Sequence, residues 1–259
     1  MKKIRQKEII DILEREKVIN TIQTAAHFDV SIETIRRDLD QLEGQGVLKK
    51  IYGGAELRPK TKVLPSPLDK RRTIQHEAKT AIAARAAAYI LDRSTVALDA
   101  GSTIFELCSH LQGKKDLIII SGDIHTAAEL LSTGQRKVYM MGGFLTPDGT
   151  SNGTFAKDFF NSISSIDFFI TSTDGATPED GLSTDEEGIN NLKKRYLKKA
   201  ATCIAMIDHT KFMRRGFYKL CDFSEIDIVI TDSLTPSDIL DKVRNCGPAV
   251  DIVPISRDA

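Results

Sequence analysis

Apolar and polar positions alternate with the period of an α-helix in three successive segments of the first 45 residues. The apolar face of the first segment consists of Ile4, Ile9, Ile10 and Leu13. Asn20 and Gln23 have capping-box spacing and predict a second, short helix over residues 21–27. The third segment has its apolar stripe at Ile32, Ile35, Leu39 and Leu42. Ser31 directly precedes this stripe and is a favourable N-cap, so the pattern predicts three helices in close succession.

The polar side of the third predicted helix is rich in side chains that can contact DNA. Thr34, Arg36, Arg37 and Gln41 lie off the apolar stripe and are expected to face outward. Arginine can bond both acceptors on a guanine edge at once. Two surface arginines alone are usually just solvated charges. On a capped helix with an apolar inner side they indicate a DNA recognition helix, with residues 20–39 forming a helix-turn-helix.

A short β-hairpin is predicted directly after this helix. Glycines at 44 and 46 end the helix, and residues 47–54 have the composition of two short strands around a turn. Lys49, Lys50 and Tyr52 then lie beside the recognition helix, where they are expected to contact DNA together with Ser31. Residues 1–57 are therefore predicted to form a winged helix-turn-helix domain.

Residues 58–75 interrupt these patterns and predict a linker. Pro59, Pro65 and Pro67 cannot lie inside a helix, and the lysines and arginines between them favour water. A second domain is expected over residues 76–259. It starts with an alanine-rich helix, whose pattern covers residues 74–91.

From Thr95 onward, short apolar runs end in clusters of Gly, Ser, Thr or Asp, and a helical pattern follows most of them. The runs cover residues 96–98, 117–120, 138–141, 168–170, 203–207 and 226–230. Buried strands that alternate with helices predict an α/β domain with a mainly parallel sheet. Ligands of such sheets bind outside the carboxyl ends of the strands, where these polar clusters collect.

Two of the polar clusters are suited to a phosphate group. Gly101, Ser102 and Thr103 precede a helix expected from residue 104, and residues 151–154 precede another expected over 155–163. A helix N-terminus offers free N–H groups and the positive end of the helix dipole. The second cluster contributes Ser151, Gly153 and Thr154. For any single glycine here, turn formation is the more common explanation, and no nucleotide-binding fingerprint is present.

Charged residues at other strand ends complete a candidate sugar-phosphate site. Asp99 and Asp208 could accept hydrogen bonds from sugar hydroxyls, and Lys193 and Lys211 could contact a phosphate or carbonyl oxygen. No cofactor or metal is expected, because the four cysteines lack the spacing of a metal site and are interpreted as reduced thiols.

Composition narrows the class of protein further. The 259 residues are 41% apolar and 28% charged, as expected of a soluble globular chain. No stretch is long enough to span a membrane and no signal peptide fits the N-terminus, which predicts a cytoplasmic protein. There are 36 basic and 36 acidic residues, so attraction to DNA must come from local placement of basic side chains.

Two parts of the chain resemble the DeoR family of bacterial transcriptional regulators. Residues 5–55 share its helix-turn-helix pattern, namely Arg5, Ile9, Leu13, Ser31, Thr34 to Leu39, and Gly53 to Ala55. Residues from about 77 to 232 resemble its C-terminal sensor domain at Asp99 to Thr103, Gly142, Gly143, Ser151, Gly153, Asp174, Gly175, Gly181, Leu182, Asp208, Lys211 and Phe212. The chain departs from the family pattern at residues 121–123 and 189–195, which leaves the effector and the role of Lys193 open.

The resemblance implies a sensor domain that is related to ribose-5-phosphate isomerase and binds phosphorylated sugars. It adds Gly143, Asp174 and Gly175 to the expected effector site. The expected function is a regulator, most simply a repressor of a sugar or sugar-alcohol catabolic operon. A phosphorylated sugar is expected to release it from double-stranded operator DNA.

The expected assembly is a homo-oligomer, a dimer or a tetramer, because one small module makes few phosphate contacts. It is expected in the cytoplasm, at the nucleoid when bound to its operator. The alternative is a sugar-phosphate isomerase-like enzyme with an appended DNA-binding module. In that case Asp99 or Asp208 would act as base and Lys211 would hold the enediolate. The DNA module favours regulation, so no catalytic residue is assigned.

Overall fold

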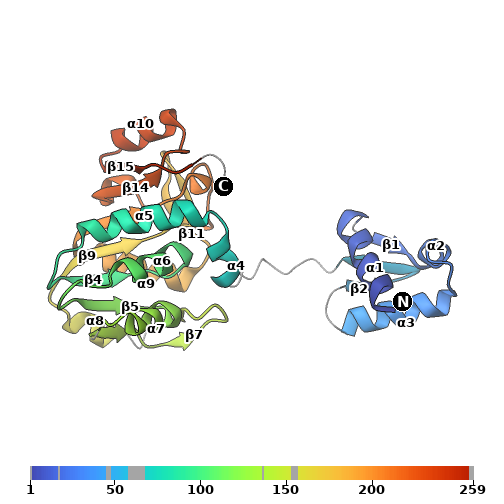
Figure 1. Cartoon of the computed structure of the whole chain (residues 1–259). Helices are drawn as coiled ribbons and strands as arrows, with labels where there is room; N and C mark the ends of the chain where they lie inside the picture. Colours follow the sequence, from blue (N-terminus) through green and yellow to red (C-terminus); the bar gives the residue numbers. More distant parts are fainter. Residues whose placement is uncertain are drawn as a thin grey trace. The chain divides into compact units, whose positions relative to one another are not determined.

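The chain folds into two compact units, residues 1–65 and 66–259 (Figure 1). This computed structural model describes residues 2–16, 18–44, 48–57, 68–135, 137–152 and 157–256. Residues 68–73, expected in the linker, form helix α4 (Leu68–Thr73), which contacts α6 (Ser102–His110) of the second unit. The prolines that suggested a linker all precede α4 and lie in residues 58–67, outside the described residues.

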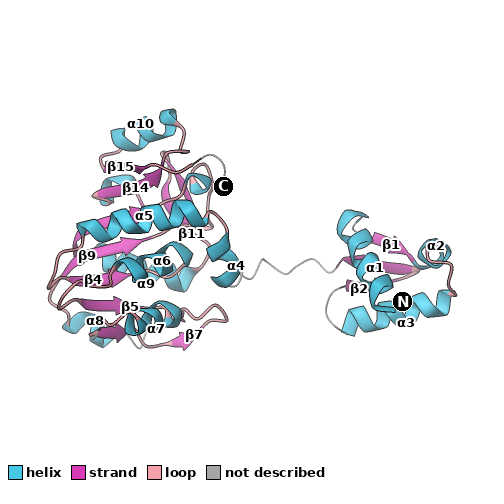
Figure 2. Ribbon diagram, viewed as in Figure 1, coloured by secondary structure: helices cyan, strands magenta, loops and turns pink. Residues whose placement is uncertain are grey.

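The first unit has the predicted winged helix-turn-helix fold. Its elements are α1 (Lys2–Glu16), β1 (Val18–Asn20), α2 (Thr21–His27), α3 (Ile32–Gly44), β2 (Leu48–Ile51) and β3 (Gly54–Leu57) (Figure 2). The wing strands pair antiparallel, and β1, which was not predicted, pairs with β3 to complete the sheet β1-β3-β2. A Cβ on Gly54 would lie 1.9 Å from the carbonyl oxygen of Ile19, so this pairing requires glycine.

The core of the first unit confirms most of the predicted apolar stripe. Ile9, Leu13, Ile35, Leu39 and Leu42 are buried in one cluster. Ile32 was expected in the same stripe but is 40% exposed. It is the first residue of α3, where the stripe extends past the core. The predicted inward side chain of Ile4 lies outside the described part of the chain.

A seven-stranded parallel sheet forms the centre of the second unit, as predicted. The strands are β4 (Thr95–Leu98), β5 (Ile118–Ser121), β6 (Val138–Met140), β9 (Ile166–Thr171), β12 (Ala200–Met206), β14 (Ile228–Asp232) and β15 (Ala249–Val253). Their order is β15-β14-β12-β9-β4-β5-β6. All six predicted strands are present, and the unpredicted β15 occupies one edge.

Helices cover both faces of this sheet. They are α5 (His76–Tyr89), α6, α7 (Ile124–Ser132), α8 (Lys157–Ser162), α9 (Glu187–Leu197) and α10 (Ser237–Asn245). Ile82 of α5 and Leu107 of α6 pack with Val96 in one apolar cluster. Tyr196 of α9 and Val243 of α10 belong to the other cluster, which contains alternate residues of the same strands.

Short antiparallel strands flank the main sheet and were not predicted. One group, β10 (Gly175–Thr177), β11 (Gly181–Thr184) and β13 (Tyr218–Cys221), forms a small sheet. In the other, β7 (Phe144–Leu145) pairs with β8 (Ser151–Asn152). Ser151 and Asn152 therefore form a strand rather than the start of a helix, and the helix expected over residues 155–163 is described as α8 (Lys157–Ser162). Gly153 and Thr154 lie outside the described residues.

All four cysteines are free thiols, three of them buried. Burial raises the pKa of Cys108, Cys203 and Cys221 to about 12 each. Because the thiolate is the reactive form, we expect iodoacetamide at about pH 8 to spare these three in the folded protein and to alkylate all four in urea. Mass spectrometry of tryptic peptides measures this directly. Native-state alkylation of Cys108 at the rate seen in urea would contradict it.

Candidate DNA interface and ligand pocket

Side-chain caps place α2 and α3 as the sequence predicts. The Asn20 Oδ1 atom accepts hydrogen bonds from the backbone N–H groups of Ile22 and Gln23, at 2.9 and 3.2 Å. Ser31 Oγ accepts from the N–H of Thr34 at 3.2 Å and lies 2.8 Å from its hydroxyl. These bonds satisfy backbone donors that a helix start leaves unpaired, and so fix where both helices begin.

The two arginines of α3 point into solvent. The side chains of Arg36 and Arg37 are 63% and 76% exposed, and each lies within 4 Å of the Glu33 carboxylate. Exposed ion pairs of this kind contribute little free energy. Both guanidinium groups are therefore available to a DNA groove.

Asp38, next to these arginines in the sequence, is buried and was not recognised as a structural residue. Its Oδ2 atom accepts a hydrogen bond from Arg5 Nε at 2.6 Å, and its Oδ1 atom accepts one from Gln6 Nε2 at 3.1 Å. Gln6 also donates to the exposed side chain of Gln41 at 2.8 Å. This network fixes α1 against the inner side of α3.

The wing lysines are engaged within the domain. Lys50 Nζ forms an ion pair with Asp40 of α3, and that hydrogen bond raises the pKa of Lys50. Lys49 Nζ lies 3.6 Å from Glu56 on the facing strand. Tyr52 is fully exposed at the turn between the strands. Contact of either lysine with a DNA phosphate would have to replace these surface pairs.

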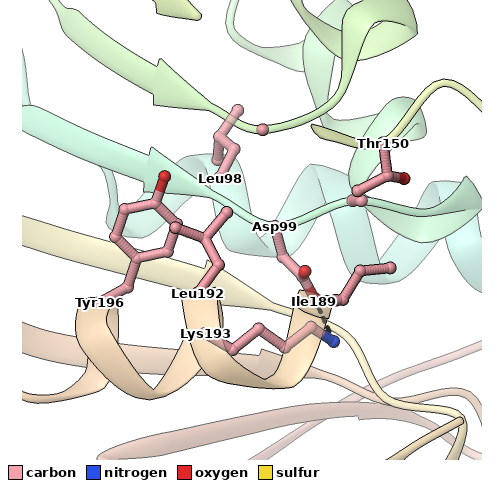
Figure 3. A pocket seen from close by; sticks show the side chains of 9 residues that line it. Leu98, Asp99, Thr150, Ile189, Leu192, Lys193 and Tyr196 are labelled. Atoms are coloured by element: carbon pink, nitrogen blue, oxygen red, sulfur yellow. Dashed lines mark ion pairs between the residues drawn. The ribbon is translucent and has the colours of Figure 1, made fainter. Parts of the chain in front are cut away.

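A pocket lies at the carboxyl ends of β4 and β5 (Figure 3). Its cavity has a volume of about 10 Å³, close to the space of one water molecule. Its walls come from the ends of β4 and β5, from the loop before β8 and from α9. The residues that line it are Leu98, Asp99, Ala100, Gly122, Thr150, Ile189, Leu192, Lys193 and Tyr196.

Asp99 and Lys193, predicted separately from the sequence, form a buried ion pair in this pocket. Lys193 Nζ lies 2.7 Å from Asp99 Oδ2 and donates a hydrogen bond to the carbonyl oxygen of Ser172 at 2.9 Å (Figure 3). Asp99 Oδ2 also accepts from the Thr171 hydroxyl and the Ser172 N–H, each at 3.0 Å. The Oδ1 atom makes no hydrogen bond within the described ranges, so it can accept one from a ligand.

Tyr196 contributes a polar atom that sequence analysis missed. Its side chain is 1% exposed, and its hydroxyl has no hydrogen-bond partner in the part of the chain that the structure describes. Burial raises the pKa of this hydroxyl, which keeps it neutral and able to donate. A buried unpaired hydroxyl costs about 1–3 kcal/mol, which a ligand or a water molecule can recover. In the sequence, Tyr196 is indistinguishable from a core aromatic residue.

The helix predicted to follow Gly101 is present as α6, which begins at Ser102. Gly101 has φ = +124°, a conformation that favours glycine, and precedes the first turn. Ser102 and Thr103 are buried in that turn, and their hydroxyls have no hydrogen-bond partner among the described residues. Gly101 directly follows Ala100, a lining residue of the pocket, so this helix start is next to the pocket in the chain.

The remaining predicted effector residues lie outside the pocket lining. Asp208 is buried and caps the 3-10 turn η1 (His209–Lys211), accepting from the Thr210 N–H at 3.0 Å. Asp174 is exposed and accepts a hydrogen bond from the backbone N–H of Asp185.

The predicted glycines and the remaining polar residues also lie outside the pocket lining. A Cβ on Gly175 would lie 2.5 Å from the carbonyl oxygen of Arg214, so packing alone explains the glycine at this position. Gly143 is exposed, Lys211 is half-buried, and Ser151 is buried in β8.

Among the described residues, no cluster of His, Cys, Asp and Glu could hold a metal ion. No helix in those ranges is long and apolar enough to cross a membrane.

A winged helix-turn-helix unit joined to an α/β unit defines a DNA-binding transcriptional regulator. Residues 5–61 match the model of the DeoR-like helix-turn-helix domain, and residues 74–233 match that of the DeoR C-terminal sensor domain. The chain therefore belongs to the DeoR family.

Named relatives are similar over nearly their whole length. The HTH-type transcriptional regulator GolR of Listeria innocua is 32% identical over 96% of this chain and 97% of its own. The putative aga operon transcriptional repressor of Escherichia coli O157:H7 is 31% identical over 96% and 93%. The glycerol-3-phosphate regulon repressor of E. coli K12 is 28% identical over 91% and 93%. The chain is thus a transcriptional regulator rather than an enzyme.

Among solved structures, this chain is similar to ribose 5-phosphate isomerase A of Neisseria gonorrhoeae. It is 18% identical, with a TM-score of 0.43 over 55% of this chain and 56% of that one.

Proposed function

We propose that this regulator represses a sugar or sugar-alcohol catabolic operon and that a phosphorylated sugar releases it from its operator. The observation that carries the proposal is the pocket in which Asp99 and Lys193 meet beside the start of α6. The name of one relative supports it, because the glycerol-3-phosphate regulon repressor is named after a phosphorylated sugar alcohol.

The chemistry of the pocket walls supports one orientation of the ligand. Its phosphate binds at Gly101, Ser102 and Thr103, where the start of α6 offers backbone N–H groups and the positive end of the helix dipole to an anion. Its hydroxyls bond to Asp99 Oδ1 and to the hydroxyl of Tyr196. Both atoms lack partners in the described part of the chain, so a polyol satisfies them.

Operator DNA binds on the outer side of α3 and the wing. Arg36 and Arg37, with Thr34 and Gln41, contact base edges, and the cap Ser31 and wing residues Lys49, Lys50 and Tyr52 contact the backbone. A homo-oligomer supplies two or more such modules. One module buries only about 600–1,000 Å² on DNA. The protein acts in the cytoplasm, on the nucleoid.

A gel-shift titration tests the effector. The protein is bound to DNA from upstream of its own operon and titrated with sugar phosphates and with the matching unphosphorylated sugars. We expect one phosphorylated sugar to release the DNA and to raise the melting temperature, since it binds only the folded state. Release by an unphosphorylated sugar at equal concentration would reject the phosphate requirement.

Removal of either recognition-helix arginine should weaken operator binding. We expect Arg36→Ala or Arg37→Ala to cost about 1–3 kcal/mol of specific binding, or roughly 5–150-fold in Kd. The matched control is Arg15→Ala, which removes an exposed arginine of α1. Unchanged operator affinity in both variants, with the fold intact, would place the interface elsewhere.

A further inference from the structure

Arg71 of α4 has an incompletely satisfied guanidinium group. Its Nε atom is buried without a hydrogen-bond partner among the described residues. Its Nη2 atom lies 3.5 Å from Asp148 Oδ2, a distance typical of a loose ion pair. A well-formed arginine–carboxylate pair has two parallel bonds of about 2.7–2.9 Å. Arg71 therefore has donor capacity that this carboxylate does not use.

Arg71 belongs to a segment that the second unit holds firmly. The neighbouring Arg72 donates from Nε to Glu106 Oε1 at 3.1 Å and lies 4.1 Å from the ring centroid of Phe105, both on α6. Lys79 Nζ donates to the carbonyl oxygens of Arg71 and Ile74, at 2.5 and 2.6 Å. These contacts fix α4 against the helix whose first turn is the predicted anion site.

The groups around Arg71 come from the elements that line the pocket. Asp148 stands two residues before the lining residue Thr150. Glu186 precedes α9, which carries Lys193 and Tyr196. Burial, followed by the charges of Asp148 and Asp174, raises the pKa of Glu186, and the charge of Arg71 lowers it. Arg71 thus pairs with the loop before β8, and its charge acts on Glu186, which precedes α9.

Further cationic groups lie close to Arg71. Burial lowers the pKa of Lys79 to about 8, the charges of Asp208 and Glu106 raise it, and the charges of Lys211 and Arg71 lower it. Arg71 therefore lies in a group of cations and carboxylates, in which the carboxylates compete with an anionic ligand for the cations.

We propose that Arg71 is an effector-binding residue, which exchanges Asp148 for the phosphate of the ligand. This inference rests on the proposed function, since it requires a phosphorylated effector. Phosphate accepts two parallel hydrogen bonds from a guanidinium group and can use the Nε donor that Asp148 leaves unpaired.

The position of Arg71 makes this contact a regulatory one. α4 is the first described element after residues 58–67, which join the DNA-binding unit to the second unit. When Arg71 changes partner, the ligand acts on α4, the first helix of the second unit. This helix directly follows the residues that connect the second unit to the DNA-binding unit. A ligand shifts an equilibrium only through contacts that differ between the two states, and this exchange is such a contact.

Two substitutions at the ion pair distinguish ligand binding from a structural role. Arg71→Ala removes the proposed phosphate donor, whereas Asp148→Asn removes its competitor and retains an acceptor for the hydroxyl of Thr146. The full-length protein is titrated with inorganic phosphate and with the sugar phosphates of the gel-shift panel. Binding is followed by calorimetry and by melting temperature.

We expect Arg71→Ala to raise the Kd for phosphate by about tenfold or more, and Asp148→Asn to lower it. DNA release should require sugar-phosphate concentrations shifted in the same directions. The control Arg85→Ala breaks an exposed 2.9 Å pair with Asp251 and should change neither value.

The outcomes separate this inference from the proposed function. If both substitutions weaken binding alike, the ion pair only holds α4 to the loop and the inference is wrong. The same conclusion follows if Arg71→Ala binds phosphate like the parent, while the proposed function stands. If the unsubstituted protein binds neither phosphate nor any sugar phosphate, both are wrong.

Discussion

Replacing Lys193 by methionine is expected to lower the free energy of unfolding of the second unit by about 3–5 kcal/mol. The two side chains of the pair with Asp99 are only 5% and 2% exposed, so the substitution leaves a buried carboxylate without its cation. Methionine fills a similar volume, so little of the effect comes from a cavity. Urea denaturation of the ligand-free protein, followed by circular dichroism, measures the loss.

A double-mutant cycle shows whether the pair itself is responsible. Asp99→Asn in the Lys193→Met background removes the unpaired charge and keeps acceptors for Thr171 and Ser172. The double variant should regain a large part of the lost stability. If it is no more stable than Lys193→Met alone, the charge of Asp99 is not the cause.

Replacing Arg5 by methionine should abolish operator binding, although Arg5 contacts no proposed DNA residue directly. Asp38 is 1% exposed, and Arg5 is the cation that compensates its charge. We expect the free energy of unfolding of the first unit to fall by about 3–5 kcal/mol. For a unit this small, that is a large part of its total stability. Gel shifts and the urea transition of the full chain report the two effects.

The same helix provides a matched control for Arg5. Arg15 is 75% exposed and pairs only with its neighbour Glu16, so Arg15→Met should unfold at the parent's urea concentration. Restoration of binding by Asp38→Asn in the Arg5→Met background would confirm that the unpaired carboxylate causes the defect. Normal operator affinity in Arg5→Met alone would exclude this explanation.

Local signals allowed much of the fold to be predicted from the sequence. Ser31 and Asn20 mark helix starts because capping depends on neighbouring residues only. The six predicted strands were visible as apolar runs. Ile32 was misplaced because periodicity does not show where a core ends. Asp38 lies on the buried stripe between Ile35 and Leu42, and its position could have indicated a buried carboxylate.

The composition of the pocket was harder to predict because it depends on strand order. β4 lies between β9 and β5, and only this arrangement brings α9 to Asp99. Asp99 and Lys193 were each chosen for their chemistry, but nothing in the sequence pairs them. Arg71 was hidden in a segment that prolines marked as a linker. Asp208 caps η1 in the structure, and sequence alone does not distinguish a short cap from a ligand-binding carboxylate.

The order of strands in the main sheet separates the two units in time as well as in sequence. β4 pairs with β9 about 70 residues later in the chain, and β9 in turn pairs with β12. On the ribosome, at about 5–20 residues per second, the central strands meet on the order of ten seconds after the first unit has been synthesised. The first unit has short-range contacts, which fold fast, whereas a sheet of distant partners folds slowly. A nascent chain can therefore hold a folded DNA-binding unit before its pocket exists.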